Sequence, residues 1–255
     1  MKVYFIGAGP GASDLITVRG AQILGRAPVV LYAGSLVSKA ILVHCRADAR
    51  VINTAKLSLD EQEVYYGDAR DQNLDVARLH SGDPSIYGAV AEQMWRLDRL
   101  GIPYEVVPGV SSFVAAAALM NSELTKPEVA QTVILTRSGG RASLVPERES
   151  LRSLAAHTTT MCVFLSGAQL THVVSELLAH YRPKTPVALI QKATWPEERI
   201  WFGSLERIAD EISPAEWELS TMLLVGEALN RNSGTESRLY SAGYSHRYRK
   251  SRKKA

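Results

Sequence analysis

The sequence lacks any apolar run that approaches the ~20 residues required by a membrane-spanning helix. The first apolar run, in MKVYFIGAGPG, passes at once into glycines, whereas a secretory signal peptide needs a longer apolar region and a small-residue cleavage site. The composition, with 46% hydrophobic and 22% charged residues, is typical of a globular protein rather than a disordered one. We therefore expect a globular, cytoplasmic protein of one large domain or two ordinary ones.

Cysteine is scarce: Cys45 and Cys162 are the only two, and neither belongs to a C-x-x-C pair. The six histidines form no H-x-x-x-H pair. A disulfide framework needs more cysteines, and a zinc site needs ligands at short, regular spacings. We expect two ordinary thiols and no metal site.

The excess of positive charge is confined to the carboxyl-terminal end. The chain has 29 Lys or Arg and 26 Asp or Glu residues, and residues 229–255 hold eight of the basic ones with a single acid, Glu236. This leaves 21 basic and 25 acidic residues in the rest of the chain. We interpret residues 230–255 as a mobile basic tail, and we expect neither nucleic acid nor a membrane as a partner.

Short β-branched runs alternate with helical patterns along the whole chain, which is typical of an α/β fold with parallel strands. In the helical segments, apolar residues recur at i, i+3 and i+4, and we expect helices over residues 13–27 and 87–101. The expected strands are 2–7, 28–32, 49–53, 74–80, 104–109, 131–138, 158–167, 185–193, 199–205 and 220–229.

The alternation lapses once, in the polar segment NSELTKPEVA, which contains a proline and resembles a linker. Its position predicts two α/β domains, the first with a mostly parallel sheet and the second, with fewer clear helices, with a mixed sheet. The predicted limits are 1–120 for the first domain, 121–130 for the linker, 131–229 for the second domain and 230–255 for the tail.

The stretch GAGPGASDLIT follows the first expected strand, and Gly7, Gly9 and Ala12 fit the dinucleotide pattern G-x-G-x-x-A. That fingerprint also needs an acid at the end of the next strand to hold a ribose, and VVLYAGS contains none. Pro10 removes an amide that would help to bind a pyrophosphate, and no G-x-x-x-x-G-K-[ST] phosphate loop exists. A nicotinamide enzyme is therefore disfavoured.

Two further turns, HSGDPSIYG and VVPGVSS, also follow expected parallel strands. Gly82 is costly to order and Pro84 lacks a donor, so a strand end alone gives little reason for either residue. Ligands of open α/β sheets bind at the carboxyl ends of the strands. We therefore expect the three turns to share one ligand-binding edge.

Several stretches resemble the tetrapyrrole methyltransferase family, whose members use S-adenosylmethionine. The motifs are FIGAGPGASDLITVRG, HSGDPSIYG and VPGVSSFVAAAA, and VVLYAGSLV, ELTKPEVAQTVILTR and QKATWPEERI are similar to the cobalamin-pathway branch. The resemblance extends from about Val3 to Leu229. Within that branch it favours enzymes that methylate C11 of precorrin-4 to give precorrin-5.

The resemblance implies two α/β domains with S-adenosylmethionine in the cleft between them, a tetrapyrrole substrate and a homodimer. In this family the GDP turn meets the methionine and ribose parts of the cofactor largely through backbone groups. The cofactor contacts implied by motif position are Pro10, Ser81, Gly82, Asp83, Ile86, Ser111 and Ser112, with Leu165, Ala193 and Thr221 in the second domain.

Methyl transfer from a sulfonium to a nucleophilic ring carbon needs proximity and orientation more than a strong base. Asp83, His80 and Tyr87 are candidates for proton handling or substrate contact, but each has an ordinary structural role, and the catalytic residue is left unassigned. For Asp83 a cap on the following helix is favoured. The substrate's carboxylates predict a cationic rim, for which the candidates are Arg19, Arg137, Arg141 and Lys192.

Other functions remain open from the sequence. The acceptor could be another precorrin or uroporphyrinogen III, with or without cobalt in the substrate. Relatives of the same fold act on a protein histidine derivative or on ribosomal RNA. A binding module without catalysis would bind the cofactor but give no turnover.

Overall fold

The computed structural model describes residues 1–139, 144–165, 169–217 and 220–251, without the side chain of Leu165. Two compact units form. Unit 1 consists of Met1–Ala116 and Lys192–Arg199, and unit 2 consists of Ala117–Gln191 and Ile200–Ala255. The domain limits expected from the sequence stay a prediction.

Unit 1 contains a five-stranded sheet in the order β3-β2-β4-β1-β5. Every neighbouring pair is parallel, which confirms the predicted parallel sheet. Because β1 lies between β4 and β5, the loops that follow these three strands leave the same edge side by side. The strands are β1 (Val3–Gly7), β2 (Val29–Tyr32), β3 (Arg50–Asn53), β4 (Val76–His80) and β5 (Tyr104–Val107).

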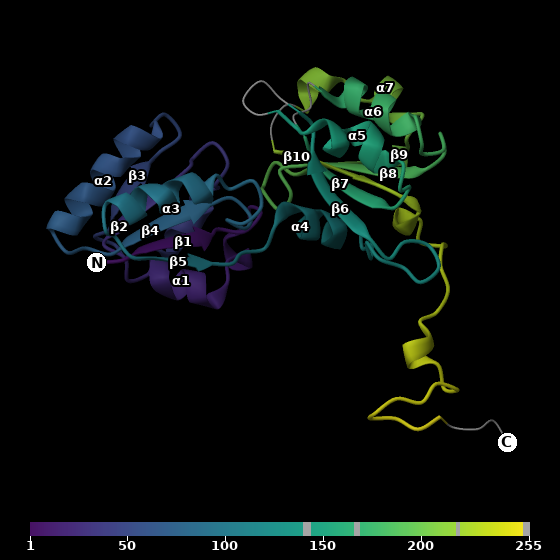
Figure 1. Ribbon diagram of the computed structural model, residues 1–255, viewed down its shortest axis with the longest axis horizontal. Coiled ribbons are helices and arrows are strands. Elements are labelled where there is room, and N and C mark those ends of the chain that lie inside the picture. Colours follow the sequence, from purple (N-terminus) through teal and green to yellow (C-terminus); the bar gives the residue numbers. More distant parts are fainter. Residues whose placement is uncertain (140–143, 166–168, 218–219, 252–255) are drawn as a thin grey trace. The chain divides into compact units, whose positions relative to one another are not determined.

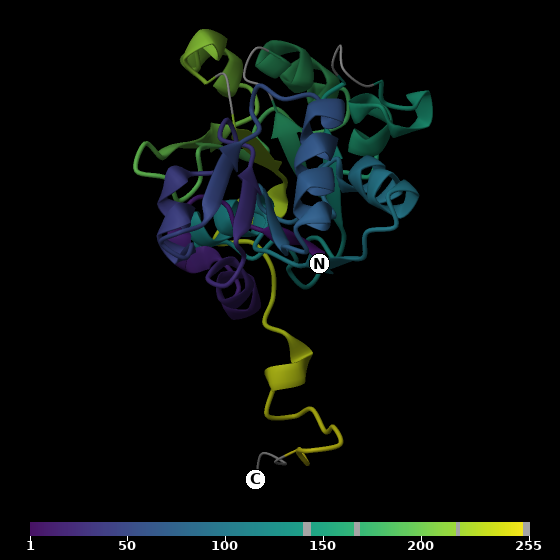
Figure 2. The same cartoon turned by 90° about the vertical axis from the view of Figure 1, so that its left-hand side faces the viewer.

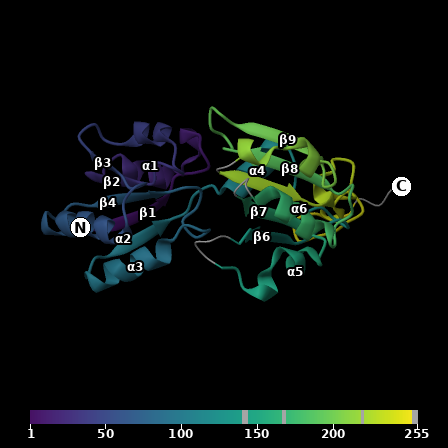
Figure 3. The same cartoon turned by 90° about the horizontal axis from the view of Figure 1, so that it is seen from above.

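Helices cover both faces of this sheet. α1 (Val18–Leu24) lies on one face and α2 (Leu59–Asp71) and α3 (Val90–Arg99) on the other, as Figures 1, 2 and 3 show. Side chains along β1 point alternately to the two faces of the sheet, so this strand contributes to the hydrophobic core on each face. Ile6 packs in the core on the α1 side, and Phe5 packs in the core on the α2 and α3 side. α4 (Ser112–Leu119) follows β5 and contains the boundary between the units.

The helix expected over residues 13–27 is wrong as a continuous element. A short 3-10 turn covers Ser13–Leu15, and α1 begins only at Val18. Ile16 and Thr17 between them are extended, and the Thr17 hydroxyl accepts a hydrogen bond from the Gly20 amide at 3.1 Å. β-Branched residues favour extended backbone, and a threonine at this position caps the helix rather than continuing it.

α2 is a helix for which the apolar pattern gives little indication, since LDEQEVYYGDARD is largely polar. A capping box begins it: the Ser58 hydroxyl accepts from the Glu61 amide, and the Glu61 carboxylate accepts from the Ser58 amide at 2.7 Å. The S-x-x-E spacing is the signal in the sequence that indicates this helix.

Unit 2 contains a second five-stranded sheet, in the order β6-β7-β10-β8-β9. β7 is parallel to β6, whereas β10 is antiparallel to both β7 and β8, so the predicted mixed sheet is confirmed. The strands are β6 (Val133–Arg137), β7 (Thr160–Leu165), β8 (Pro186–Gln191), β9 (Arg199–Ser204) and β10 (Thr221–Val225).

One face of this sheet packs against α5 (Leu151–Ala155), α6 (Leu170–Leu178) and α7 (Ile208–Glu211), which lie together in Figure 1. Val163 and Leu223 point into this core, and their neighbours Cys162 and Leu224 on the opposite face are also buried. Both faces of the central strands are therefore covered, which explains their continuous apolar sequences.

Within the described ranges, no helix is long and apolar enough to cross a membrane. The same part of the chain contains no group of three or more His, Cys, Asp or Glu side chains placed to hold a metal ion.

Candidate functional site

The loops that follow β1 and β4 are joined through their backbones. Gly9 and Gly82 exchange two hydrogen bonds: the Gly82 amide donates to the Gly9 carbonyl at 2.8 Å and the Gly9 amide to the Gly82 carbonyl at 3.3 Å. The Ala8 amide donates to the His80 carbonyl at 2.8 Å, which extends the pairing of β1 with β4. The predicted meeting of the three turns at one edge is confirmed.

Glycine is required at this edge because other backbone lies so close. A Cβ on Gly109 would lie 2.2 Å from the Gly82 carbonyl oxygen, and a Cβ on Gly7 would lie 2.5 Å from the Gly109 Cα. Gly82 itself has φ +62°, which favours glycine. Contacts between the loops therefore account for these glycines, so their presence is not by itself an indication of a ligand.

Asp83 connects two of the loops. One carboxylate oxygen accepts from the Gly109 amide at 2.8 Å, and the other accepts from the Ser85 amide at 2.8 Å and from the Ser85 hydroxyl. Partial burial favours the protonated form, but the bonds from Ser85 and Gly109 outweigh it and lower the pKa of Asp83. The predicted cap on the following helix is wrong: Asp83 holds an Asx turn and the loop after β5, and α3 begins only at Val90, after Ala89 as its N-cap residue.

His80 lies beneath this edge and is buried. Burial, together with the neighbouring positive charge of Arg78, lowers the pKa of His80 to about 3 against a weaker opposing hydrogen bond to the Gly88 backbone. The ring also packs edge-on to Phe5, with ring centroids 5.6 Å apart. A buried, neutral ring does not offer the positive charge that binding a substrate carboxylate would use.

A buried polar cluster surrounds Arg78 on the same side of the sheet. The Arg78 guanidinium donates to Gln93 Oε1 at 3.2 Å and to Thr54 Oγ1 at 2.8 Å, and the Tyr66 hydroxyl donates to the same Gln93 oxygen at 3.3 Å. All four side chains are buried. Burial lowers the pKa of Arg78 and raises that of Tyr66 to about 12.

The cluster holds a strained segment at the end of the GDP turn. Tyr87 and Ala89 have φ values of +53° and +48°, in the left-handed region that non-glycine residues rarely adopt. Gln93 Nε2 donates to the Ala89 carbonyl at 2.9 Å. Strain of this kind persists where surrounding contacts outweigh it, and it is concentrated at functional sites.

A segment from late in the sequence completes the edge. Trp195 Nε1 donates to the Pro10 carbonyl at 2.8 Å, and the Ala12 amide donates to Thr194 Oγ1 at 2.9 Å. Sequence reasoning missed both residues. The signal was present in QKATWPEERI, where a tryptophan and a threonine stand among charged residues between two strands.

Eight of the ten predicted cofactor contacts lie in unit 1: Pro10, Ser81, Gly82, Asp83, Ile86, Ser111, Ser112 and Ala193. All of them follow strand ends of this edge or, for Ala193, pack on it: a Cβ on Gly11 would lie 2.9 Å from the Ala193 carbonyl oxygen. The other two, Leu165 and Thr221, are direct Cα partners at the ends of β7 and β10 in unit 2. Their roles as cofactor contacts stay a prediction.

The candidates for a cationic rim are spread over both units. Arg19 is exposed on α1, and Lys192 Nζ lies 5.7 Å from the centre of the Trp195 ring. Arg137 ends β6 and borders a hollow of about 480 Å³ in unit 2. Arg141 lies outside the described residues.

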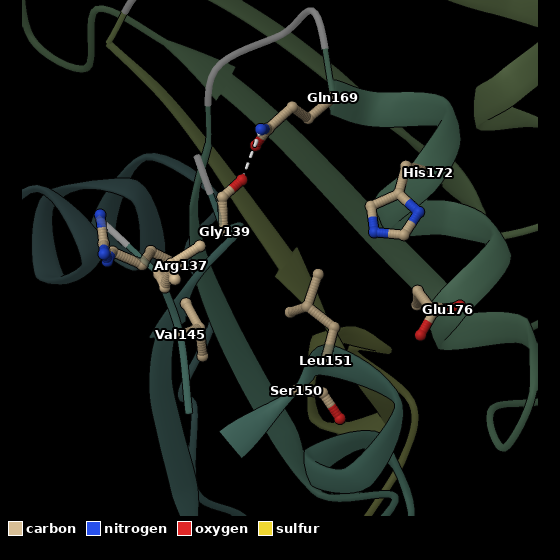
Figure 4. A pocket seen from close by; sticks show the side chains of 9 residues that line it. Arg137, Gly139, Val145, Ser150, Leu151, Gln169, His172 and Glu176 are labelled. Atoms are coloured by element: carbon tan, nitrogen blue, oxygen red, sulfur yellow. Dashed lines mark hydrogen bonds between the residues drawn. The ribbon is translucent and has the colours of Figure 1, made fainter. Parts of the chain in front are cut away.

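Figure 4 shows this hollow between the end of β6 and the helices α5 and α6. Gln169 closes one side by donating to the Gly139 carbonyl at 2.5 Å, and His172 and Glu176 project from α6. Glu176 is bound by Arg152, whose hydrogen bond lowers the pKa of the Glu176 carboxyl. Of the predicted cofactor contacts whose side chains the structure describes, none lines this hollow.

The two cysteines are free thiols. Burial raises the pKa of both, that of Cys162 to about 12. Both are therefore protonated at neutral pH and are weak nucleophiles.

The profile of the tetrapyrrole (corrin/porphyrin) methylases matches residues 2–209. The chain belongs to this family. A tetrapyrrole methylase of Sinorhizobium sp., named precorrin-4 C(11)-methyltransferase, is 48% identical over 249 residues, which cover 98% of each chain.

Solved structures of other tetrapyrrole methylases share the fold. A cobalt-precorrin-4 methyltransferase is 44% identical, with a TM-score of 0.86 over 90% of this chain and 96% of the other. The uroporphyrin-III C-methyltransferase of Thermus thermophilus, complexed with S-adenosylhomocysteine, is 29% identical, with a TM-score of 0.75 over 90% and 99% of the two chains.

Proposed function

We propose that this tetrapyrrole methylase transfers a methyl group from S-adenosylmethionine to C11 of precorrin-4, giving precorrin-5 in cobalamin biosynthesis. The observation that carries the proposal is the 48% identity to a precorrin-4 C(11)-methyltransferase over 98% of both chains. The joined loops after β1, β4 and β5 support it, since they form one compact edge where α/β sheets bind ligands.

The residues at this edge fit the proposed methyl donor. They offer hydroxyl groups at Ser81 and Ser112, backbone groups around Gly82, and the amino end of α4, and groups of this kind orient polar ligands. The carboxylate of Asp83 is occupied by Ser85 and Gly109. The hydroxyl and backbone groups offered at Ser81, Gly82 and Ser112 are neutral, and the Asp83 carboxylate keeps its negative charge while it holds the turn.

S-adenosylmethionine supplies an electrophilic methyl group, and the electron pair of its breaking S–C bond stays on sulfur while the ring's π electrons form the new C–C bond. The protein need not provide a covalent nucleophile. Its residues hold the donor in line with the acceptor carbon, which contributes up to about 7–11 kcal/mol to lowering the barrier. The buried His80, with its pKa of about 3, remains neutral during the reaction.

A methylation assay tests the proposal. Purified protein and S-adenosylmethionine are incubated with precorrin-4, cobalt-precorrin-4 or uroporphyrinogen III, and the products are weighed by mass spectrometry. One added methyl on precorrin-4, located at C11 by NMR, is the expected result. Methylation of the cobalt complex alone would move the assignment to the cobalt-bearing substrate, as in the structural relative. Methylation of uroporphyrinogen III alone would contradict the assignment of precorrin-4 as the substrate.

Homodimer formation and a cytoplasmic location are further parts of the proposal, supported by the resemblance to the family. Light scattering is expected to give twice the chain mass of 27.9 kDa. A mass of one chain across the micromolar range would contradict the dimer.

A further inference from the structure

The segment Lys192–Arg199 runs from the residue after β8 to the first residue of β9, both strands of unit 2, but belongs to unit 1. It packs on Pro10, Gly11 and Ala12 of the glycine-rich loop, residues 8–12, that follows β1. We call Thr194 and Trp195 the clasp, because these two residues contact that loop from one side.

The clasp engages the glycine-rich loop at three consecutive residues. Trp195 Nε1 donates to the Pro10 carbonyl at 2.8 Å, and Thr194 Oγ1 accepts from the Ala12 amide at 2.9 Å. Between these bonds, Gly11 lies against the indole, so that a Cβ there would be 2.1 Å from Trp195 Cδ1. Two polar contacts and one steric contact thus fix the backbone of residues 10–12.

The clasp is itself held in a costly conformation. Thr194, a β-branched residue, has φ +68°, and Lys192 has φ +48°. The Thr194 amide donates to Glu198 Oε2 at 2.6 Å, and the Trp195 amide donates to the Lys192 carbonyl at 2.9 Å. A left-handed conformation is unfavourable for threonine, and surrounding contacts must outweigh that cost for it to persist.

The far end of the glycine-rich loop is bound to the GDP turn. Gly9 pairs with Gly82 through two backbone hydrogen bonds. The loop is therefore fixed between the clasp and the turn that carries Ser81, Gly82 and Asp83, and loosening the clasp would let Pro10 to Ala12 move relative to that turn.

We propose that Thr194 and Trp195 are positioning residues that lock the glycine-rich loop in the conformation that binds the methyl donor. The part of this inference that concerns ligand binding rests on the proposed function. The locked loop itself does not, and it is measurable in the free protein.

Three substitutions separate the contacts. Thr194→Val keeps the shape of the side chain but removes the acceptor for Ala12, and Thr194→Ser retains a hydroxyl at that position. Trp195→Phe removes the donor to Pro10. Trp201→Phe is the matched control, because Trp201 belongs to unit 2 and its Nε1 donates at 3.1 Å to Glu211 of the same unit.

Hydrogen exchange of the Ala12 amide in the free protein is the first measurement. Thr194→Val is expected to raise its rate about tenfold, the equivalent of one ordinary hydrogen bond, while Thr194→Ser and Trp201→Phe stay near the unsubstituted protein. Unchanged exchange at the amides of β4, a central strand of unit 1, shows that this unit of each variant is folded. An Ala12 rate that does not respond to Thr194→Val overturns the lock.

Calorimetric titration with S-adenosylmethionine, together with steady-state kinetics, is the second measurement. Thr194→Val and Trp195→Phe are expected to raise Kd and KM for the donor about tenfold with kcat within about twofold, and Thr194→Ser to restore affinity. Equal affinity in all variants, or an equal loss in Trp201→Phe, overturns the positioning role. If the unsubstituted protein binds no S-adenosylmethionine while Ala12 exchange responds as expected, the proposed function fails and the lock stands.

Discussion

Glycine 109 shows how much the edge of unit 1 depends on single residues. Its Cα lies so close to the loop after β4 that a Cβ would approach the Gly82 carbonyl oxygen to 2.2 Å and the Gly7 Cα to 2.7 Å. Neither contact is with a flexible side-chain end, so relief of the clash requires the backbone of a neighbouring loop to move.

Gly109→Ala is therefore expected to destabilise the protein by about 1–3 kcal/mol, the usual cost of overpacking a rigid site. Gly67→Ala is the control, because Gly67 lies within α2 and a Cβ there meets nothing within 4 Å. That substitution is expected to stabilise by about 0.5–1 kcal/mol. Urea unfolding measures both, and equal effects would contradict the steric explanation.

His80 makes stability depend on pH. Its pKa is about 3 in the folded protein and about 6.5 when unfolded. The unfolded chain therefore gains a proton in this window that the folded protein does not. The contribution of neutral His80 to the free energy of unfolding is fully present above pH 6.5. It is lost as the pH falls toward 3, at up to about 1.4 kcal/mol per pH unit.

Substitution His80→Gln removes this titration while keeping a polar side chain. Urea unfolding at intervals between pH 7 and pH 4 is expected to give a shallower loss of stability for the variant. Because other groups titrate in both proteins, the difference between the two curves is the quantity to compare. Parallel curves would mean that His80 takes up a proton in the folded state.

At the scale of elements, the amino end of α3 and the GDP turn depend on one buried side chain. Gln93 accepts from Arg78 and Tyr66 and donates to the carbonyl of the left-handed Ala89. Gln93→Leu would leave the buried guanidinium and hydroxyl without this acceptor and release the turn.

We expect Gln93→Leu to lower the free energy of unfolding by about 2–4 kcal/mol. A buried charged donor left without its acceptor costs more than a hydrogen bond lost at the surface. Gln72→Leu is the matched control, because Gln72 is exposed at the end of α2. Among the hydrogen bonds described, its side chain makes one, from Nε2 to the nearby Asp68 carbonyl at 3.2 Å. Chemical denaturation compares the two, and a cost below about 1 kcal/mol for Gln93→Leu would show that the cluster is dispensable.

Local patterns predicted the strands better than the helices. All ten expected strands are present, because each is a short β-branched run bounded by turn residues. The helix expected over residues 13–27 failed at Ile16 and Thr17, where the apolar period continues but a threonine side chain caps a new helix. The apolar period of a sequence indicates which face of a helix is buried. It does not indicate where a side chain takes the place of a backbone hydrogen-bond acceptor and so begins a new helix.

At the scale of the whole molecule, the basic tail is bound to unit 2 at its start, where the Asn230 carbonyl accepts from Lys126 and Arg231 donates to the Met120 carbonyl. Its last described hydrogen bonds run within residues 237–251: Arg249 donates to the carbonyls of Leu239, Tyr240 and Ser241, and Ser251 donates to Ser245. Truncation after Ser237 is expected to leave the thermal midpoint within about 2 °C, since terminal segments contribute little unless they pack on a core. Scanning calorimetry checks this, and a larger drop would show that the tail packs on the folded protein.

The sequence by itself determined the α/β class, the two kinds of sheet and the three turns at the carboxyl ends of β1, β4 and β5. These follow from local composition and from the rule that parallel strands end at a common edge. The motifs also carried the resemblance to the tetrapyrrole methylases, which the full-length relatives confirm.

Only the tertiary structure decided what the glycines and polar residues of that edge contact. Gly7 and Gly109 accommodate each other's backbone, Asp83 binds Ser85 and Gly109, and Trp195 reaches Pro10 from 185 positions away in the sequence. No local pattern encodes such contacts, because they depend on where the chain returns between β8 and β9 of the second sheet. Sequence spacing predicted which elements form; the packing of distant segments decided which atoms meet.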